Sequence, residues 1–404
     1  MGFAPVKGRV ETLDVLRGLA IFGMFAVNMT ADVFWADSFD ELSPGSADYL
    51  VLAVVKLFAG GKFITIFSFL FAIGFYVQIE RRMQAGLSVP AFWLKRMSGL
   101  LLIALVANAL TIPAWILVDY SLFGLPLLLF YKMRPGRILA AAVALLLVER
   151  FFDFVVPVFL SPDGIGLPSL SPVADAIHDL VSQVRHNGTF LDVSGTAILH
   201  LWEELTWWPY YLIDLDFFVV MLLGLYVARR GAVWDEGVRQ ALAKKTVTWL
   251  LGIGIVSALA WVVIARLDPG EDSAELFRAL RRFIAWPFAT SVLGLGYVAA
   301  VALLMNNERW RRRLSVLIPV GRMVLTNFLF TGFVLAFVSY EWGLGLYGEV
   351  YPLAGLLIVA ACLPLQVLAS RWWLARFAFG PVEWLWRRWT YGGPLPLQSA
   401  RAPA

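Results

Sequence analysis

Three polar residues share one face of a long apolar segment near the N-terminus. Asp14, Arg17 and Asn28 are the strongly polar residues from position 14 to position 28. Eleven residues at about 100° each return Asn28 to nearly the azimuth of Arg17, about 16 Å farther along a helix. That distance is roughly half of a bilayer core. The spacing predicts a cytoplasmic-side cation joined to a buried amide, which is the geometry of a passage or of a site reached from two sides.

Other ionisable residues fall inside predicted membrane spans, where they are costly and indicate function. These residues are Glu149, Arg150, Asp153, Asp214 and Asp216, with Asp119 at an outer turn. At about 1.5 Å of helix per residue from the nearest cytoplasmic arginines, they lie as deep in the membrane as Asn28 or deeper. This predicts a polar cluster in the outer half of the membrane. Alternatively, Arg150 and Asp153 form an ion pair that only joins helices.

The three histidines lie in the longest predicted outer segment, residues 161–206. His200 is followed by Glu203 and Glu204 on the same helical face, an arrangement that suits a general base with a carboxylate to orient its ring. The alternative is a solvated histidine on an amphipathic helix. One histidine and two carboxylates are not a closed ligand set, so no metal site is expected.

The elements that must position these residues are membrane helices. The 404 residues are 60% hydrophobic and 15% charged, with a mean hydropathy of +0.75, which is far from the balance of a soluble domain. We predict an all-α, polytopic transmembrane bundle in one domain, residues 1–404. Its ten spans are 14–35, 62–80, 93–112, 115–131, 137–160, 207–228, 246–265, 283–305, 315–340 and 352–372.

Charge distribution sets the predicted topology. Residues 29–55 carry acidic residues and no lysine or arginine, whereas Arg81, Arg82, Lys95 and Arg96 follow the next span. Both termini are therefore predicted to be cytoplasmic. The net charge of +4 needs no nucleic acid to explain it, and no nucleic-acid motif occurs.

Three segments depart from simple spans. Residues 115–131 contain Gly124 and Pro126 and could form a re-entrant arm instead of a span, and residues 47–59 are predicted to be an interfacial helix. Residues 161–206 are predicted to hold an amphipathic helix on the outer face. Arg322 lies about 13 Å beyond Arg313 at the start of the ninth span, so it is expected to need a partner below the headgroups.

Four motifs resemble the signatures of the YeiB-type bacterial membrane proteins, a family within the wider transmembrane acyltransferase superfamily. They are Thr12–Gly18 (TLDVLRG), Gly61–Phe63 (GKF), Gly321–Asn327 (GRMVLTN) and Gly380–Arg387 (GPVEWLWR). The resemblance extends over most of the chain and makes 315–391 the C-terminal signature region.

This resemblance implies acyl transfer across a bacterial plasma (inner) membrane, from cytoplasmic acyl-CoA to an extracytoplasmic glycan or other envelope acceptor. Membrane lipids and other copies of the chain are the expected partners. The residues that would hold the donor phosphates are Arg17, Arg81, Arg82, Arg96 and Arg322. A supporting polar network would comprise Asp14, Lys62, Glu149, Arg150, Asp153 and Asn327.

Asn28 departs from one branch of that superfamily. In the cell-surface sugar O-acyltransferases a catalytic histidine stands eleven residues after the arginine, where this chain has Asn28. An amide can position a thioester or stabilise an oxyanion but cannot act as a base. The candidates for the base are therefore Asp119, His200, Asp214 and Asp216. The alternative function is a transporter or lipid-handling protein that uses the same polar cavity without covalent chemistry.

Overall fold

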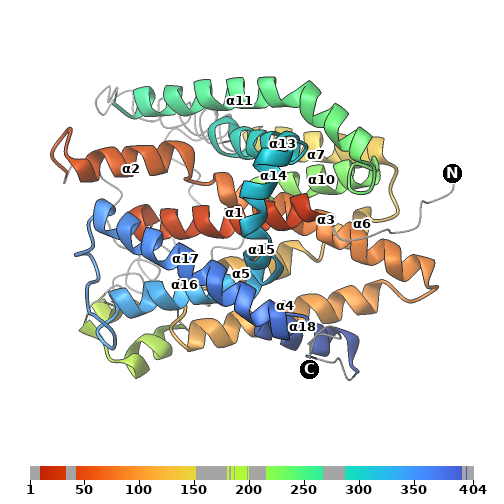
Figure 1. Cartoon of the computed structure of the whole chain (residues 1–404). Helices are drawn as coiled ribbons and strands as arrows, with labels where there is room; N and C mark the ends of the chain where they lie inside the picture. The colour runs from red at the N-terminus through yellow and green to blue at the C-terminus, as the bar shows by residue number, and fades with distance from the viewer. Residues whose placement is uncertain are drawn as a thin grey trace.

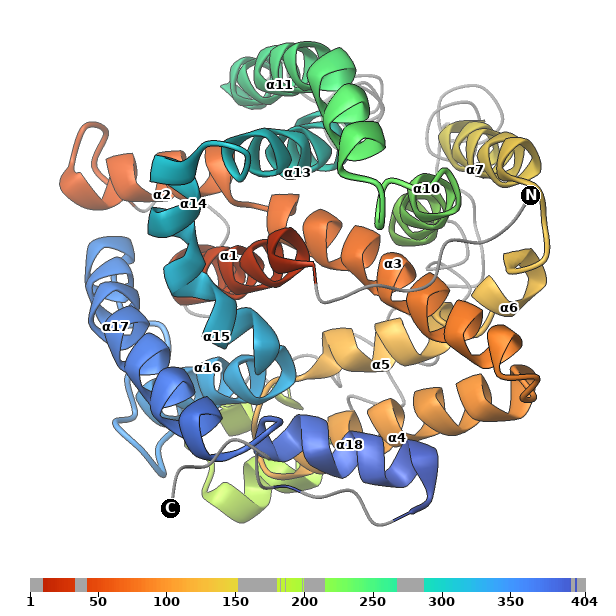
Figure 2. The same ribbon diagram turned by 45° about the vertical axis from the view of Figure 1, so that its right-hand side comes forward.

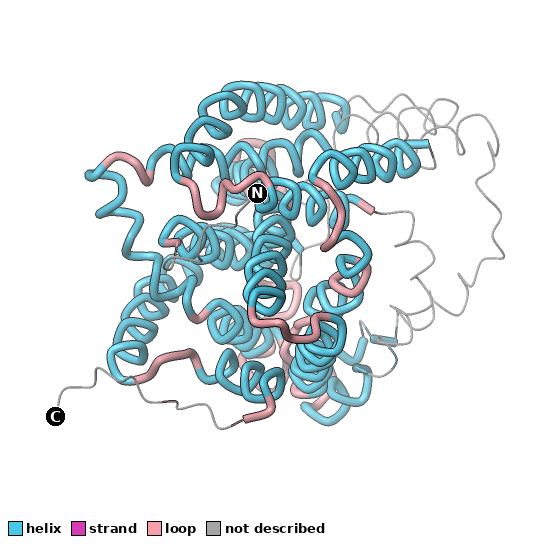
Figure 3. The backbone as a smooth tube through the Cα atoms, turned by 90° about the vertical axis from the view of Figure 1, so that its right-hand side faces the viewer, coloured by secondary structure: helices cyan, strands magenta, loops and turns pink. Residues whose placement is uncertain are grey.

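The computed structural model describes residues 10–32, 42–151, 215–266, 287–393 and 397, and all of 180–199 except 182, 186 and 198. Throughout these residues the regular structure is helical and no β-strand occurs (Figure 3). The predicted all-α class is therefore confirmed for the described part of the chain.

The helices follow the apolar runs of the sequence. Their bounds are α1 Glu11–Val27 with a π-helical turn Asn28–Asp32, α2 Ala47–Phe58, α3 Lys62–Gln84, α4 Pro90–Ala109, α5 Trp115–Phe123, α6 Leu127–Phe130, α7 Pro135–Arg150, α10 Asp216–Arg229, α11 Glu236–Arg266, a π-helical segment Pro287–Val292, α13 Leu293–Leu304, α14 Glu308–Leu314, α15 Ile318–Arg322, α16 Val324–Ser339, α17 Pro352–Arg376 and α18 Pro381–Tyr391. Proline opens α4, α7, α17 and α18, where its missing N–H costs no helical hydrogen bond.

Several helices have the length and composition of membrane spans. Among the described residues five helical segments qualify: 11–30, 47–84, 90–109, 236–261 and 352–376. A sixth arises if Ala289–Leu304 and Glu308–Arg322, bent by 119°, are one broken span. The chain is therefore a helical membrane protein, while the ten crossings and the orientation of the termini stay predictions. Residues 115–130 form shorter apolar helices, so the choice between a re-entrant arm and a span stays open.

The predicted single span over 315–340 differs from the structure. A short 3₁₀ turn and α15 end at Arg322, and α16 begins only at Val324. The break lies at Met323, whose φ of −112° and ψ of 41° are not helical. Its physical reason is tertiary, because a side chain from α18 satisfies the first N–H groups of α16, as described below.

Helix α1 lies at the centre of the bundle (Figures 1 and 2). It contacts α2, α3, α13, α15, α16 and α17. In the most apolar 18-residue stretch of this candidate span, 61% of the residues are buried, against 22 to 44% in the corresponding stretches of the other four candidate spans. The helix that carries Arg17 and Asn28 is thus the one around which the others pack.

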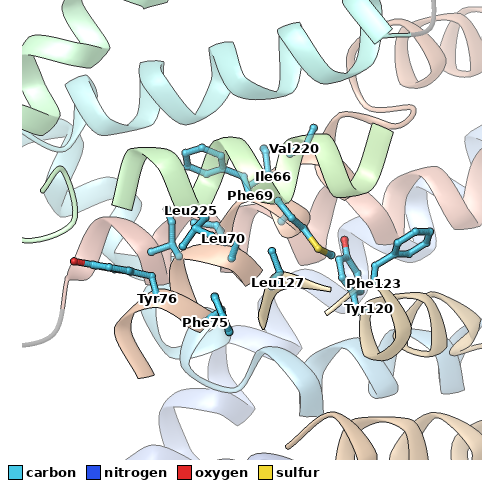
Figure 4. Packing of buried hydrophobic residues seen from close by; sticks show 14 of the residues in the cluster. Ile66, Phe69, Leu70, Phe75, Tyr76, Tyr120, Phe123, Leu127, Val220 and Leu225 are labelled. Carbon is cyan, nitrogen blue, oxygen red and sulfur yellow. The ribbon is translucent and has the colours of Figure 1, made fainter. Parts of the chain in front are cut away.

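A second packing centre lies along α3, as Figure 4 shows. Ile66, Phe69 and Leu70 of α3 pack with Leu127 of α6 and with Val220 of α10 in one buried cluster. This contact fixes α3, and therefore the helix that faces Arg17, against the rest of the bundle.

Glycines permit a close contact between α1 and α15. A Cβ added at Gly321 of α15 would lie 1.8 Å from the carbonyl oxygen of Asp14, and one at Gly18 of α1 would lie 2.6 Å from that of Leu317. Backbone therefore packs directly on backbone where two of the sequence motifs meet.

We expect Gly321→Ala to lower the free energy of unfolding by about 1–3 kcal/mol, because α1 and α15 must separate to admit the methyl group. Thermal denaturation of the protein in detergent measures the loss. Gly252→Ala is the matched control, since a Cβ at Gly252 meets no atom within 4 Å. Equal melting temperatures for the two variants would contradict the prediction.

Candidate functional site

Arg17 is held by an ion pair near one end of α1. Its Nη1 lies 3.1 Å from Oδ1 of Asp14, whose side chain is 2% exposed, while the Arg17 side chain is 26% exposed. The Nη2 atom lies above Gly74 of α3, where an added Cβ would be 3.9 Å away. Asp14 thus holds the guanidinium where it lies against α3.

Arg96 lies within range of the charges of two other arginines, Arg17 and Arg387. Arg96 of α4 stacks on Trp386 of α18, with 3.6 Å from its guanidinium carbon to the ring centroid, and the positive charges of Arg17 and Arg387 both act on it. The Nε–H of Arg96 is buried and has no hydrogen-bond partner in the described structure. We call Arg17, Arg96 and Arg387 the arginine cluster. Guanidinium groups suit phosphate because each offers planar, paired donors.

The other three predicted donor-binding arginines lie on α3 and α15. Arg81 is exposed near the end of α3, and Arg82 donates from Nε to the Ser88 carbonyl at 3.0 Å while covering the Phe92 ring. Arg322 ends α15, directly after the glycine that packs on Asp14. The sequence prediction missed Arg387, because by charge pattern it is one of several arginines of a cytoplasmic loop.

Asn28 begins the π-helical turn at the other end of α1. Its side chain is half-buried and makes no hydrogen bond within the described residues. On α17, Gly355 packs against the carbonyl of the next residue, Met29, where an added Cβ would be 2.1 Å away. π-Turns inside helices are frequent at functional sites, and this one presents an amide whose donors and acceptor are available to a ligand.

A buried ion triad joins the ends of α7 and α10. The Nη2 atom of Arg150 lies 2.5 Å from Oε1 of Glu149 and 3.6 Å from Oδ2 of Asp216. The three residues are 8%, 1% and 7% exposed. Two groups that the sequence placed at one depth are therefore in direct contact. Asp153, the predicted alternative partner of Arg150, lies outside the described residues.

The remaining candidates are placed separately or are not described. Asp119 is half-buried on α5, beside Tyr120, whose hydroxyl bonds Ser68 and the Ile64 carbonyl of α3. Lys62 is 3% exposed at the start of α3, and its ammonium donates to the Lys56 carbonyl at 3.1 Å. His200 and Asp214 lie outside the described residues.

Glu383 of α18 caps the first turn of α16. Its Oε1 accepts from the N–H groups of Leu325 and Thr326 at 2.6 and 3.0 Å, and its Oε2 accepts from Thr326 Oγ1 at 2.6 Å. Burial raises the pKa of the Glu383 carboxyl above its ordinary value, and the hydrogen bonds limit the rise. The two C-terminal motifs thus form one junction, a role for Glu383 that the spacing along the chain does not reveal.

Asn327 belongs to a buried polar group between α16 and α17. Its Nδ2 donates to Ser370 Oγ at 3.0 Å and to the Met323 carbonyl at 2.9 Å, and Gln366 Nε2 donates to the Asn327 carbonyl at 3.3 Å. Asn327 therefore has a positioning role. Ser370 and Gln366 were missed because single polar residues in an apolar run give no pattern.

The chain resembles proteins of several bacteria along almost its full length. A family model described as "Protein of unknown function (DUF418)" matches residues 227–393, which include the Glu383 junction. The uncharacterized protein YxaH of Bacillus subtilis (strain 168) is 31% identical over 96% of this chain and 96% of its own length. The uncharacterized protein YeiB of Escherichia coli (strain K12) is 26% identical over 97% of this chain and 100% of its own. No solved structure matches. This chain therefore belongs to the YeiB-type family of proteins of unknown function that carry the DUF418 domain.

Proposed function

We propose that this protein is an acyltransferase of the bacterial plasma membrane that takes its acyl group from cytoplasmic acyl-CoA and delivers it to an extracytoplasmic glycan or other envelope acceptor. The observation that carries the proposal is the arginine cluster, in which the buried Nε–H of Arg96 has no hydrogen-bond partner among the described residues. A buried donor left without an acceptor costs about 1–3 kcal/mol. A bound phosphate of coenzyme A would remove that cost.

The geometry of α1 supports a path for the acyl chain. The eleven residues from Arg17 to Asn28 span about 16 Å of helix axis, so a donor whose phosphates lie at the arginine cluster can extend its pantetheine arm along α1. Asn28 would then donate a hydrogen bond to the thioester carbonyl and stabilise the negative charge that develops on its oxygen. The general base would come from another element, with Asp119 and Asp216 as the candidates that the described residues include.

A second candidate function is transport without covalent chemistry, which the buried Glu149–Arg150–Asp216 triad favours. Buried ionisable residues that pair with one another inside a helical bundle mark ion and proton pathways in transporters. Accumulation of a chemically unchanged solute in proteoliposomes would favour this function over acyl transfer.

Binding of coenzyme A tests the primary proposal. We expect Arg96→Gln to weaken the affinity of the purified protein for coenzyme A at least tenfold, because a charge-assisted hydrogen bond contributes about 1.5–3 kcal/mol and 1.4 kcal/mol is a factor of ten. Isothermal titration calorimetry in detergent measures the affinity. Arg81→Gln removes the same charge from an exposed position and should leave the affinity unchanged.

Pantetheine, which lacks the phosphates, should bind much more weakly than coenzyme A and should not distinguish Arg96→Gln from the wild type. The proposal fails if coenzyme A does not bind at millimolar concentration, or if the two arginine variants bind alike. A deletion strain whose envelope retains its full acylation would also speak against it.

A further inference from the structure

A small polar cavity lies at the end of the bundle where α4 ends and α5 begins, the end that the charge pattern predicts to be outside. Its volume is about 30 Å³, which exceeds the space that one water needs and admits a group of a few atoms. Its walls come from the α4–α5 connection, the end of α16 and the segment 185–197; the lining residues that carry the argument are Asn108, Thr111, Arg185, Thr196 and Tyr340.

Thr111 occupies a backbone position that ordinarily belongs to glycine. Its N–H donates to the Asn108 carbonyl, and the N–H of Ile112 donates to the Ala107 carbonyl, both at 2.9 Å. These are the two bonds of a Schellman motif, whose left-handed residue is usually glycine. Thr111 has a φ of +62° and is the only residue other than glycine with positive φ among the described residues.

The threonine side chain therefore costs stability at this turn. The left-handed conformation of a residue with a Cβ costs about 1–2 kcal/mol, and for a β-branched residue it is a genuine outlier. The turn itself would form equally well with glycine. The Thr111 hydroxyl is in addition buried without a hydrogen-bond partner in the described structure. Backbone strain of this kind is typical of ligand sites, and the unpaired hydroxyl in the cavity wall is available to bond a ligand.

Arg185 supplies a positive charge to the same cavity. Its side chain is half-buried and makes no ion pair within the described residues. It lies close enough to Tyr340 for its charge to act on the phenol. The Asn108 amide, in contrast, has partners for both of its polar atoms: it donates to the Ala104 carbonyl at 2.8 Å and accepts from the Ala114 N–H at 3.0 Å. Asn108 holds the turn in shape, and Arg185 and Thr111 line the cavity.

The wall that carries Arg185 is anchored to α4. The helical residues 190–197 begin with a capping box, in which the Thr189 N–H donates to Asp192 Oδ2 at 2.9 Å. Ser194 Oγ donates to the Ala109 carbonyl at 2.5 Å. The cavity is therefore built from elements that are tied to one another.

We propose that this cavity binds one oxyanion group, a phosphate or a carboxylate, with Arg185 as the charge partner and the Thr111 hydroxyl as a hydrogen-bond donor. The site is separate from the arginine cluster, and its existence does not depend on acyl transfer. The group could belong to a free anionic solute or to the headgroup of an anionic lipid, and the two sources differ in the test below.

The test uses the full-length protein and four variants. The melting temperature is measured in neutral detergent at increasing concentrations of inorganic phosphate. In a separate series it is measured at increasing concentrations of phosphatidylglycerol, with phosphatidylcholine as the control lipid. Arg185→Gln removes the charge and Thr111→Gly removes the hydroxyl. Thr111→Ser keeps the hydroxyl, and Arg313→Gln removes an exposed charge on α14.

We expect one of the two anions to raise the wild-type melting temperature, with an apparent affinity at least tenfold weaker in Arg185→Gln and in Thr111→Gly but unchanged in Thr111→Ser and Arg313→Gln. A response to phosphate identifies a free anion, and a response to phosphatidylglycerol alone identifies a headgroup. Without ligand, Thr111→Gly should be at least as stable as the wild type, so weaker binding is not unfolding. Equal titrations of Thr111→Gly and Thr111→Ser, or of Arg185→Gln and Arg313→Gln, would overturn the proposal.

Discussion

Replacing Arg150 with alanine is expected to lower the free energy of unfolding by about 3–5 kcal/mol, since it leaves the two buried carboxylates of Glu149 and Asp216 side by side without their shared cation. Unfolding in detergent, followed by circular dichroism, measures the change. Arg230→Ala removes an exposed arginine and should cost little.

A second set of variants separates loss of the cation from loss of packing. If all three charged side chains are replaced together, Glu149→Leu with Arg150→Met and Asp216→Leu, much of the stability should return, because apolar residues of similar volume need no pairing. An Arg150→Ala protein as stable as Arg230→Ala would show that the triad contributes nothing to the fold.

The Glu383→Ala variant is expected to lose about 2–4 kcal/mol of stability. Alanine removes a helix cap, which contributes about 1–2 kcal/mol, and leaves buried donors of Leu325 and Thr326 without an acceptor. Glu383→Gln keeps one oxygen acceptor and should lose less. The melting temperatures of the two variants, measured at one pH, test whether Glu383→Ala loses more stability than Glu383→Gln.

The pH dependence of stability gives an independent check on Glu383. Because the pKa of this carboxyl is higher in the folded protein than its ordinary value of 4.5, the folded state binds the proton more tightly than the unfolded state. Its contribution is fully present below about pH 4.5 and is lost as the pH rises through the raised pKa. The stability difference between wild type and Glu383→Gln should therefore change in this window, and a constant difference would contradict the assignment.

Much of the helical framework could be predicted from sequence. The spans predicted at 62–80, 93–112 and 352–372 correspond to α3, α4 and α17 within four residues at each end, because long apolar runs have only the helix available in a membrane. The break at Met323 could not be predicted in this way. Residues 315–340 are apolar on both sides of the break. The N–H groups of Leu325 and Thr326 after it bond the carboxylate of Glu383, which lies far along the chain, and local sequence does not reveal that partner.

In the candidate site, too, some residues could be predicted from the sequence and their long-range contacts could not. Arg17, Arg150 and Asp216 were identified because charges in apolar runs are rare enough to be noticed one at a time. The contact between Arg150 and Asp216 was not predicted, because it joins two helices that are far apart in the sequence. Thr111 carries no signal in sequence, because its significance depends on a backbone angle.

The contact between Glu383 and α16 also sets an order of assembly during biosynthesis. Residues 324–339 leave the ribosome before residues 381–391, so the first N–H groups of α16 have no acceptor from α18 until that helix has been made. Chains fold largely in the order of synthesis. The final arrangement of α15 and α16, and with it the close contact of Gly321 on α1, is therefore completed only after residues 381–391 have been made, so synthesis of α18 is the step that completes this junction.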